Sequence, residues 1–339
     1  MKTAAKIGAV LAAAVVILVA SIAIGSVSLS PGQVVEILLS RLPGGDSSAV
    51  DANLASIVWG MRFPRAVLAF LPGAALSASG TVMQSILKNP LASSYTLGVS
   101  SGASLCAALV MVTGFTLPVL GMFTLPAAGF LGGLVTVFLA LAFANRLDGK
   151  MENQTVILVG MVFSLFVNAI LTLVTALSRE HLQQMVFWQM GSFTGRDWSH
   201  VAVLFPVTLL ALLALQCFTR EMDIMSFGEE QAMSIGVDLK RVKMLLMGLA
   251  ALLTGTAVSL VGVIGFVDLI APHVVRRIFG SSHRLVLPLS AVFGGTFLML
   301  AELISRTVMA PTVIPVGAVT ALVGAPFFAV VFFRGRKMK

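Results

Sequence analysis

The chain has 339 residues, of which 58% are hydrophobic and only 11% are charged. Soluble proteins carry about 25% charged residues, so this composition excludes a soluble domain and indicates a polytopic membrane protein. The net charge of +8 does not require nucleic acid as a partner, because basic residues gather in the loops on the cytoplasmic side of a membrane protein.

The N-terminal segment carries Lys2 and Lys6 and then an uncharged run over residues 7–35. Its apolar part, residues 7–24, is longer than the about 7–15 residues of a cleaved signal peptide, and therefore predicts a first transmembrane helix. Nine hydrophobic segments follow, most of them near the ~20 residues that a crossing helix needs. The ten predicted spans are residues 7–29, 66–87, 95–112, 118–144, 154–177, 200–218, 242–263, 267–279, 285–305 and 313–333, of which the third and eighth are short.

The distribution of basic residues predicts the orientation of these spans. With both termini in the cytoplasm, 16 of the 22 lysine and arginine residues lie on the inner side and six on the outer side, as expected for a protein of the plasma (inner) membrane. The sequence therefore predicts one polytopic domain over residues 1–339, in which residues 220–241 form the longest cytoplasmic loop.

Two glycine- and serine-rich stretches predict an internal repeat. "GAALSASG" (73–80) matches "GTAVSLVG" (255–262), and the same offset pairs Pro90 with Pro272 and Gly98 with Gly280. The two copies cross the membrane in opposite directions in the predicted topology. This favours an inverted repeat of spans 2–5 and 7–10, which is typical of transporters, although small residues also serve simply for close helix packing.

The charged stretch "SFGEEQAMSIGVDLKR" (226–241) interrupts the apolar chain. Ser226 and Glu229 fit a capping box that predicts a short helix over 227–235, ended by Gly236, and Asp238 is placed to begin the next helix. One interpretation of this short helix is an interfacial helix that rests on the lipid headgroups. An anionic membrane surface would repel its acidic residues, however. A docking element for a cytoplasmic protein fits better, with apolar contacts from Phe227, Ala232, Met233 and Ile235.

The sequence resembles the FecCD-type permease subunits of ABC importers for iron-siderophores, haem and vitamin B12, also called type II importers. The resemblance covers nearly the whole chain. The segments that carry it are "RFPR" (62–65), "NPLASSYTLGVSSGAS" (89–104), "WQMGSFTGRDW" (188–198), "GEEQAMSIGVDLKRVK" (228–243), "GFVDLIAPHVVRR" (265–277), "HRLVLPLSA" (283–291) and "IPVGAVTALVGAPFF" (314–328).

This resemblance implies an all-α membrane protein that works as a homodimer in the lipid bilayer, with two cytoplasmic ABC ATPase subunits and an extracytoplasmic substrate-binding protein. It implies transport without bond chemistry: no catalytic residue, metal or cofactor in this chain, with ATP and Mg bound by the partner ATPase. The chain has no G-x-x-x-x-G-K-[ST] phosphate-binding loop, in agreement. Siderophore-bound iron is the most frequent cargo of the family, and haem and cobalamin remain alternatives.

The resemblance also implies roles for individual residues at the two ends of the permease. Its ATPase-coupling positions are Phe227, Gly228, Glu229, Glu230, Ala232, Ser234 and Gly236. Its positions for docking the binding protein are Arg62, Arg65 and Arg306. Simpler alternatives exist, namely membrane-interface anchoring for the first two arginines and an intrahelical ion pair with Glu302 for Arg306.

The gate region is less well matched to the family. The loop before the fifth span carries Asn153 and Gln154 where the family's vitamin B12 branch has small hydroxyl residues, and Asn153 could equally cap the following helix. Asn168 within the fifth span either lines the pathway or bonds to a neighbouring helix. The role of Asp268 is open.

A secondary transporter driven by an ion gradient is the main alternative, since it also uses inverted repeats. Such a transporter needs buried carboxylates for ion coupling, and the spans offer only Asp268 and Glu302. An intramembrane enzyme would need a catalytic cluster such as H-E-x-x-H, which the sequence lacks.

Overall fold

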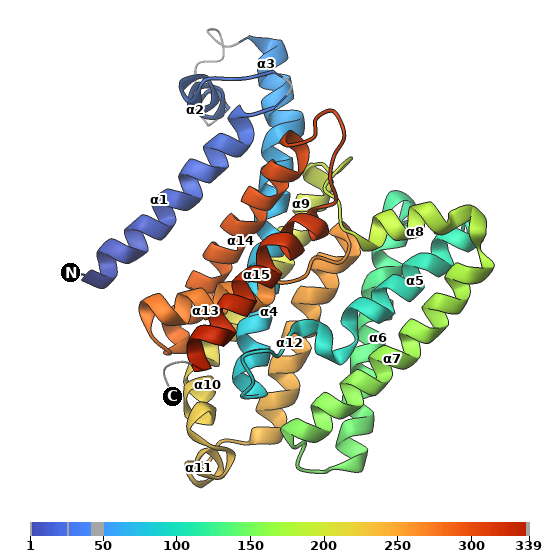
Figure 1. The fold of residues 1–339 in the computed structure, drawn as a ribbon, viewed down its shortest axis with the longest axis vertical. Helices are drawn as coiled ribbons and strands as arrows, with labels where there is room; N and C mark the ends of the chain where they lie inside the picture. Colours follow the sequence, from blue (N-terminus) through green and yellow to red (C-terminus); the bar gives the residue numbers. More distant parts are fainter. Residues whose placement is uncertain (1, 26, 42–50, 337–339) are drawn as a thin grey trace.

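The computed structural model describes residues 2–25, 27–41 and 51–336, and its regular secondary structure in these ranges is helical (Figure 1). Each of the ten predicted spans corresponds to one helix. These helices are α1 (Lys2–Ala23), α4 (Phe63–Ile86), α5 (Val99–Thr113), α6 (Thr124–Leu147), α7 (Asn153–Leu177), α9 (Trp198–Cys217), α12 (Leu239–Val261), α13 (Val267–Phe279), α14 (His283–Thr307) and α15 (Val316–Arg336).

Seven of the helical stretches in the described ranges are long and apolar enough to cross a membrane. Helix α5 and the stretch Val316–Val330 of α15 are shorter apolar segments, and α13 has only 13 residues, which rise about 20 Å. The prediction that the third and eighth segments are short is therefore confirmed.

Helix α4 runs through the middle of the bundle and packs against α14 and α12 (Figure 1). Glycines allow this close approach: a Cβ atom at Gly73 would overlap the backbone of Gly294 on α14. A Cβ atom at Gly80 would likewise overlap the backbone of Asp268 on α13. Because lipid provides no hydrophobic driving force between helices, such tight backbone contacts supply much of the packing.

The packing of the helices agrees with an inverted repeat. Helices α4 and α12 run in opposite directions in Figure 1, and α4 packs on α14 just as α12 packs on α6. The residue matches at the predicted offset are wrong, however: Gly98 directly precedes α5, whereas Gly280 directly follows α13. Small residues recur wherever helices pack closely, so these matches do not mark equivalent positions.

Short helices that hydropathy did not predict lie between the spans. Ser30 and Gln33 form a capping box at the start of α2, and Asp51 accepts hydrogen bonds from the first backbone N–H groups of α3. The short elements are α2 (Pro31–Ser40), α3 (Ala52–Ile57), η1 (Val58–Arg62), η2 (Ser94–Leu97), η3 (Gly121–Phe123), η4 (Arg179–His181), α8 (Leu182–Gln189), α10 (Thr219–Phe227) and α11 (Glu229–Ser234).

Hydrogen bonds link the start of α1 to the end of α13, and the start of α14 to α10, which lies with α11 at the bottom of Figure 1. Lys6 Nζ donates a hydrogen bond to the carbonyl of Ile278 at the end of α13 (3.1 Å), and the His283 N–H donates to Asp223 Oδ1 on α10 (2.9 Å). We call this the α11 end. The opposite end, which carries α2 and α3, is the α2 end.

Candidate functional site

Two glycines interrupt the helical segment from α10 to α12. Gly228 (φ 153°) separates α10 from α11, and Gly236 (φ 93°) follows α11. Asp238 then accepts a hydrogen bond from the Arg241 N–H at the start of α12, as predicted. The predicted capping box is wrong, because the Ser226 hydroxyl donates to the Asp223 carbonyl within α10 instead, and the predicted helix begins two residues later at Glu229.

Three large apolar side chains project from this segment. Phe227 is 78% exposed, Ile235 68% and Met233 55%. Ala232, which we expected among them, is fully buried and packs with Met225 and Leu239. Its small side chain lets α11 lie directly on α10 and α12, and this contact holds the three exposed side chains outward.

The two acidic residues of α11 point in different directions. Glu230 is exposed, whereas Glu229 accepts a hydrogen bond from the buried ammonium group of Lys243 at 2.9 Å. Lys243 Nζ also donates to Asn153 Oδ1 at 3.0 Å. Asn153 therefore does not cap α7; the residue before α7 is Glu152, whose side chain makes no capping hydrogen bond.

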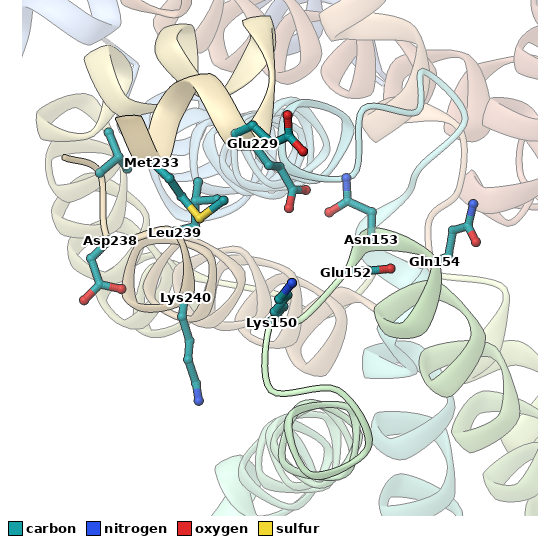
Figure 2. A pocket seen from close by; sticks show the side chains of 11 residues that line it. Lys150, Glu152, Asn153, Gln154, Glu229, Met233, Asp238, Leu239 and Lys240 are labelled. Carbon is teal, nitrogen blue, oxygen red and sulfur yellow. The ribbon is translucent and has the colours of Figure 1, made fainter. Parts of the chain in front are cut away.

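A cleft of about 630 Å³ lies between α11 and the loop that precedes α7. Figure 2 shows Glu229 and Asn153 facing each other across it, with Gln154 beside Asn153. The structure thus brings the predicted coupling residues Glu229 and Glu230 close to two of the predicted gate residues. The remaining gate candidate, Asn168, lies apart from them near the middle of α7, where its side chain is exposed on the surface of the protomer.

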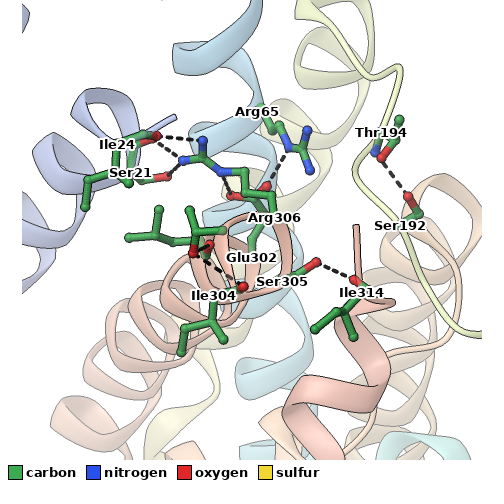
Figure 3. Close-up of polar contacts among 12 residues, drawn as sticks. Ser21, Ile24, Arg65, Ser192, Thr194, Glu302, Ile304, Ser305, Arg306 and Ile314 are labelled. Carbon is green, nitrogen blue, oxygen red and sulfur yellow. Dashed lines mark hydrogen bonds and ion pairs between the residues drawn. The ribbon is translucent and has the colours of Figure 1, made fainter. Parts of the chain in front are cut away.

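A cluster of arginines surrounds Glu302 at the α2 end (Figure 3). Arg65 Nε donates to one oxygen of the Glu302 carboxylate at 2.5 Å, and Arg306 Nε donates to the other at 3.1 Å. The intrahelical pair between Arg306 and Glu302 is therefore confirmed. The carboxylate is fully buried, so the two guanidinium groups provide the charge that permits its burial.

Arg62, one of the predicted docking residues, is largely buried, at 9% exposed. Its Nη1 donates to the carbonyls of Ile22 (2.9 Å) and Ala23 (3.1 Å) at the end of α1. Arg306 Nη1 similarly donates to the Ile24 carbonyl at 2.8 Å. The last carbonyls of a helix have no partner within the helix, and these two arginines satisfy those of α1.

The model of the FecCD transport family matches residues 13–334, nearly the whole chain. The chain belongs to this family. It is 43% identical, over 86% of its length and 82% of the relative's, to the uncharacterized ABC transporter permease protein YvrB of Bacillus subtilis (strain 168).

Other FecCD relatives carry names that specify a cargo. The cobalamin import system permease protein BtuC of Halobacterium salinarum is 39% identical over 80% of this chain and 72% of its own. The hemin transport system permease protein HmuU of Yersinia pestis is 35% identical over 83% and 85% of the two chains. A solved structure, reported as an inward-facing conformation of a metal-chelate type ABC transporter, matches with a TM-score of 0.82 at 29% identity, covering 96% and 98% of the two chains.

The FecCD family membership identifies the chain as an ABC importer permease, a multi-pass membrane subunit that is not itself catalytic. It therefore decides against the ion-driven transporter that the inverted repeat alone left open.

Two buried polar contacts of this FecCD permease were not predicted, namely those of Lys243 and Asp223. Lys243 counted in the sequence only as an inner-side cation, and Asp223 carried no prediction, yet Asp223 Oδ1 pairs with His283 Nδ1 at 2.6 Å. The pairs Lys243–Glu229 and His283–Asp223 have no sequence signal, because the two partners of each pair belong to different helices. For Lys243 the only hint is a charge near the start of an apolar span.

Proposed function

We propose that this permease imports a metal chelate, namely a ferric siderophore, haem or cobalamin, as a homodimer driven by two cytoplasmic ABC ATPase subunits. The two relatives described above that have a named cargo carry cobalamin and hemin, both of which are large tetrapyrrole complexes of a metal. A channel between two subunits suits cargo of that size, and few charged residues lie within the spans.

The observation that carries the proposal is the exposed surface of α10 and α11. Phe227, Met233 and Ile235 are apolar, largely exposed and next to the carboxylate of Glu230. A surface with apolar anchors and a charged rim is typical of a protein interface. We assign it to the ATPase, with the α11 end and both termini in the cytoplasm of a cell membrane, as the distribution of basic residues favours.

The α2 end then faces outward and receives the substrate-binding protein. Of the three arginines carried over from the family, Arg65 is the most available, with 23% of its side chain exposed. A carboxylate of the binding protein could therefore pair with Arg65, whereas Arg62 is occupied by the end of α1.

Substituting Arg65→Gln is expected to weaken docking of the binding protein to the reconstituted permease about tenfold, since it removes one charged contact. The affinity of the parent should also fall as salt rises. Surface plasmon resonance at two ionic strengths measures both effects. An unchanged affinity in the variant would remove Arg65 from the docking surface.

Residues of α7 support the homodimer. Its exposed face carries Leu165 and Phe166 next to Asn168. An asparagine that faces lipid near the middle of a span is unfavourable. A second protomer or an aqueous pathway between two protomers would provide partners for this amide.

Uptake into proteoliposomes tests the proposed function. The permease is reconstituted with its ATPase, and ferric siderophore, hemin and cobalamin are offered with the binding protein outside. We expect accumulation of one of these chelates only when ATP is supplied on the ATPase side. Uptake driven by a proton or sodium gradient without the ATPase, or uptake of none of the three chelates with ATP, would contradict the proposal.

A further inference from the structure

Lys243 lies one turn into α12 and is fully buried, although it carries a charge. Its ammonium group donates to Glu229 Oε1 (2.9 Å), Asn153 Oδ1 (3.0 Å) and the Met151 carbonyl (2.9 Å). An ammonium group has three donors, so all of them are used. A buried ammonium is strongly unfavourable unless a carboxylate pairs with it, so the contact with Glu229 is essential to its burial.

The loop before α7 is shaped to present acceptors to Lys243. Asp148 accepts hydrogen bonds from the N–H groups of Lys150 (3.0 Å) and Glu152 (2.7 Å), and the bond from Glu152, followed by that from Lys150, holds the pKa of its carboxyl below the ordinary value. Met151 has a positive φ of 54°, which is rare for a residue with a side chain. Such backbone conformations persist where the surroundings require them. Here the conformation turns the Met151 carbonyl toward the ammonium group.

The contacts of Lys243 therefore join two segments that otherwise face each other across a cleft. Glu229 is the first residue of α11, and Asn153 is the first residue of α7. The space between α11 and the loop before α7 is the cleft of about 630 Å³ in Figure 2. Within the described ranges, the hydrogen bonds that connect Glu229 to this loop run through Lys243.

We infer that Lys243 is a positioning residue that transmits movement of α11 to the start of α7. The inference rests on the proposed docking of the ATPase at α10 and α11. When the docked ATPase displaces α11, the Glu229 carboxylate cannot move away alone, because that would leave the ammonium buried and unpaired. The loop and the first turn of α7 move with it. Helix α7 carries the exposed Asn168, so the link connects the α11 end to the face that we assign to the protomer interface.

The test compares Lys243→Met with Arg241→Met in the reconstituted complex of permease and ATPase. Arg241 is the matched control: it lies on the same helix and pairs with Asp238 at 3.0 Å, but its side chain is 89% exposed. We expect Lys243→Met to retain co-purification of the ATPase and to lower chelate uptake per ATP hydrolysed about tenfold. Arg241→Met should keep the parent's chelate uptake per ATP hydrolysed, which is the measurement that tests transmission.

A second measurement separates transmission from a merely structural role. Spin labels at Gln231 on α11 and Gln154 on α7, each paired with a label on α12, report the two movements when ATP is added. In the parent both distances should change, whereas in Lys243→Met only the α11 distance should change. If both still change, or if uptake per ATP remains at the parent value, Lys243 is not the link.

Asn153→Ala removes one of the hydrogen-bond acceptors of Lys243 and leaves the docking segment unchanged. It is therefore the substitute variant if Lys243→Met does not fold. We expect a smaller loss of uptake per ATP with normal ATPase binding. The inference would be overturned if Asn153→Ala kept the parent's chelate uptake per ATP hydrolysed. Loss of ATPase binding in Lys243→Met would overturn it as well. Failure of the unsubstituted permease to bind the ATPase would instead contradict the proposed function, and the two failures are therefore distinguishable.

Discussion

Replacing Phe227 and Ile235 with aspartate is expected to abolish co-purification of the permease with its ABC ATPase. Both side chains are mostly exposed at the α11 end, where they would form the apolar centre of the interface. Loss of a central anchor weakens an interface by about 2 kcal/mol or more. Two such losses correspond to roughly a thousandfold weaker binding. Pull-down of the tagged ATPase from detergent-solubilised membranes measures the effect.

The matched control places the same charges at the opposite end of the bundle. Val308 and Met309 follow α14 at the α2 end and are 66% and 59% exposed. Val308→Asp with Met309→Asp should leave ATPase binding unchanged. If the Phe227 and Ile235 variant still pulls down the ATPase, the docking surface does not lie on α10 and α11. Loss of pull-down in the control would lead to the same conclusion.

Glu230→Arg is the appropriate charge reversal in this segment. Reversing Glu229 as well would place a second cation against the buried ammonium of Lys243 and disturb the fold for reasons unrelated to docking. Because Glu230 is exposed, its reversal changes only the charge that the ATPase meets. We expect slower association and a weaker dependence on salt, measurable by interferometry with the immobilised complex.

The sequence predicted the ten spans because lipid imposes a simple requirement. Every backbone polar group within the bilayer must be satisfied locally, so each span is a continuous apolar helix whose length can be counted. The shortness of α13 was also visible, since Asp268, His273, Arg276 and Arg277 leave only a short apolar run in "IGFVDLIAPHVVRRIFG". Helices such as α2 and α8 lie outside this requirement and depend on caps and local packing instead, which hydropathy does not detect.

The site was predicted less completely, because its buried polar contacts join distant parts of the chain. The exposure of Phe227 and the break at Gly236 follow from local patterns of apolar residues and glycine. The burial of Arg62 does not, since its partners are the carbonyls that end α1 some forty residues earlier. Ala232 illustrates the same limit: an apolar residue on a short helix can face inward or outward, and only the packed neighbours decide which.

Glu302→Gln is expected to destabilise the α2 end by about 3–5 kcal/mol, the usual effect of removing one partner from a buried ion pair. The carboxylate is fully buried between Arg65 and Arg306. A neutral amide leaves both guanidinium groups without a counter-charge among the residues that contact them. Thermal unfolding of the purified permease, followed by the fluorescence of its three tryptophans, measures the loss.

Glu36→Gln is the matched control, because Glu36 is exposed on α2 at the same end. It should stay within about 0.5 kcal/mol of the parent, as is usual for surface substitutions. A similar result for Glu302→Gln would mean that Glu302 is not needed to hold the arginines. Hydrogen exchange at the end of α1 gives an independent check, because Arg306 also donates to the Ile24 carbonyl. Faster exchange there in Glu302→Gln would show that this carboxylate orients the arginine that caps α1, a role that is separate from any docking of the binding protein.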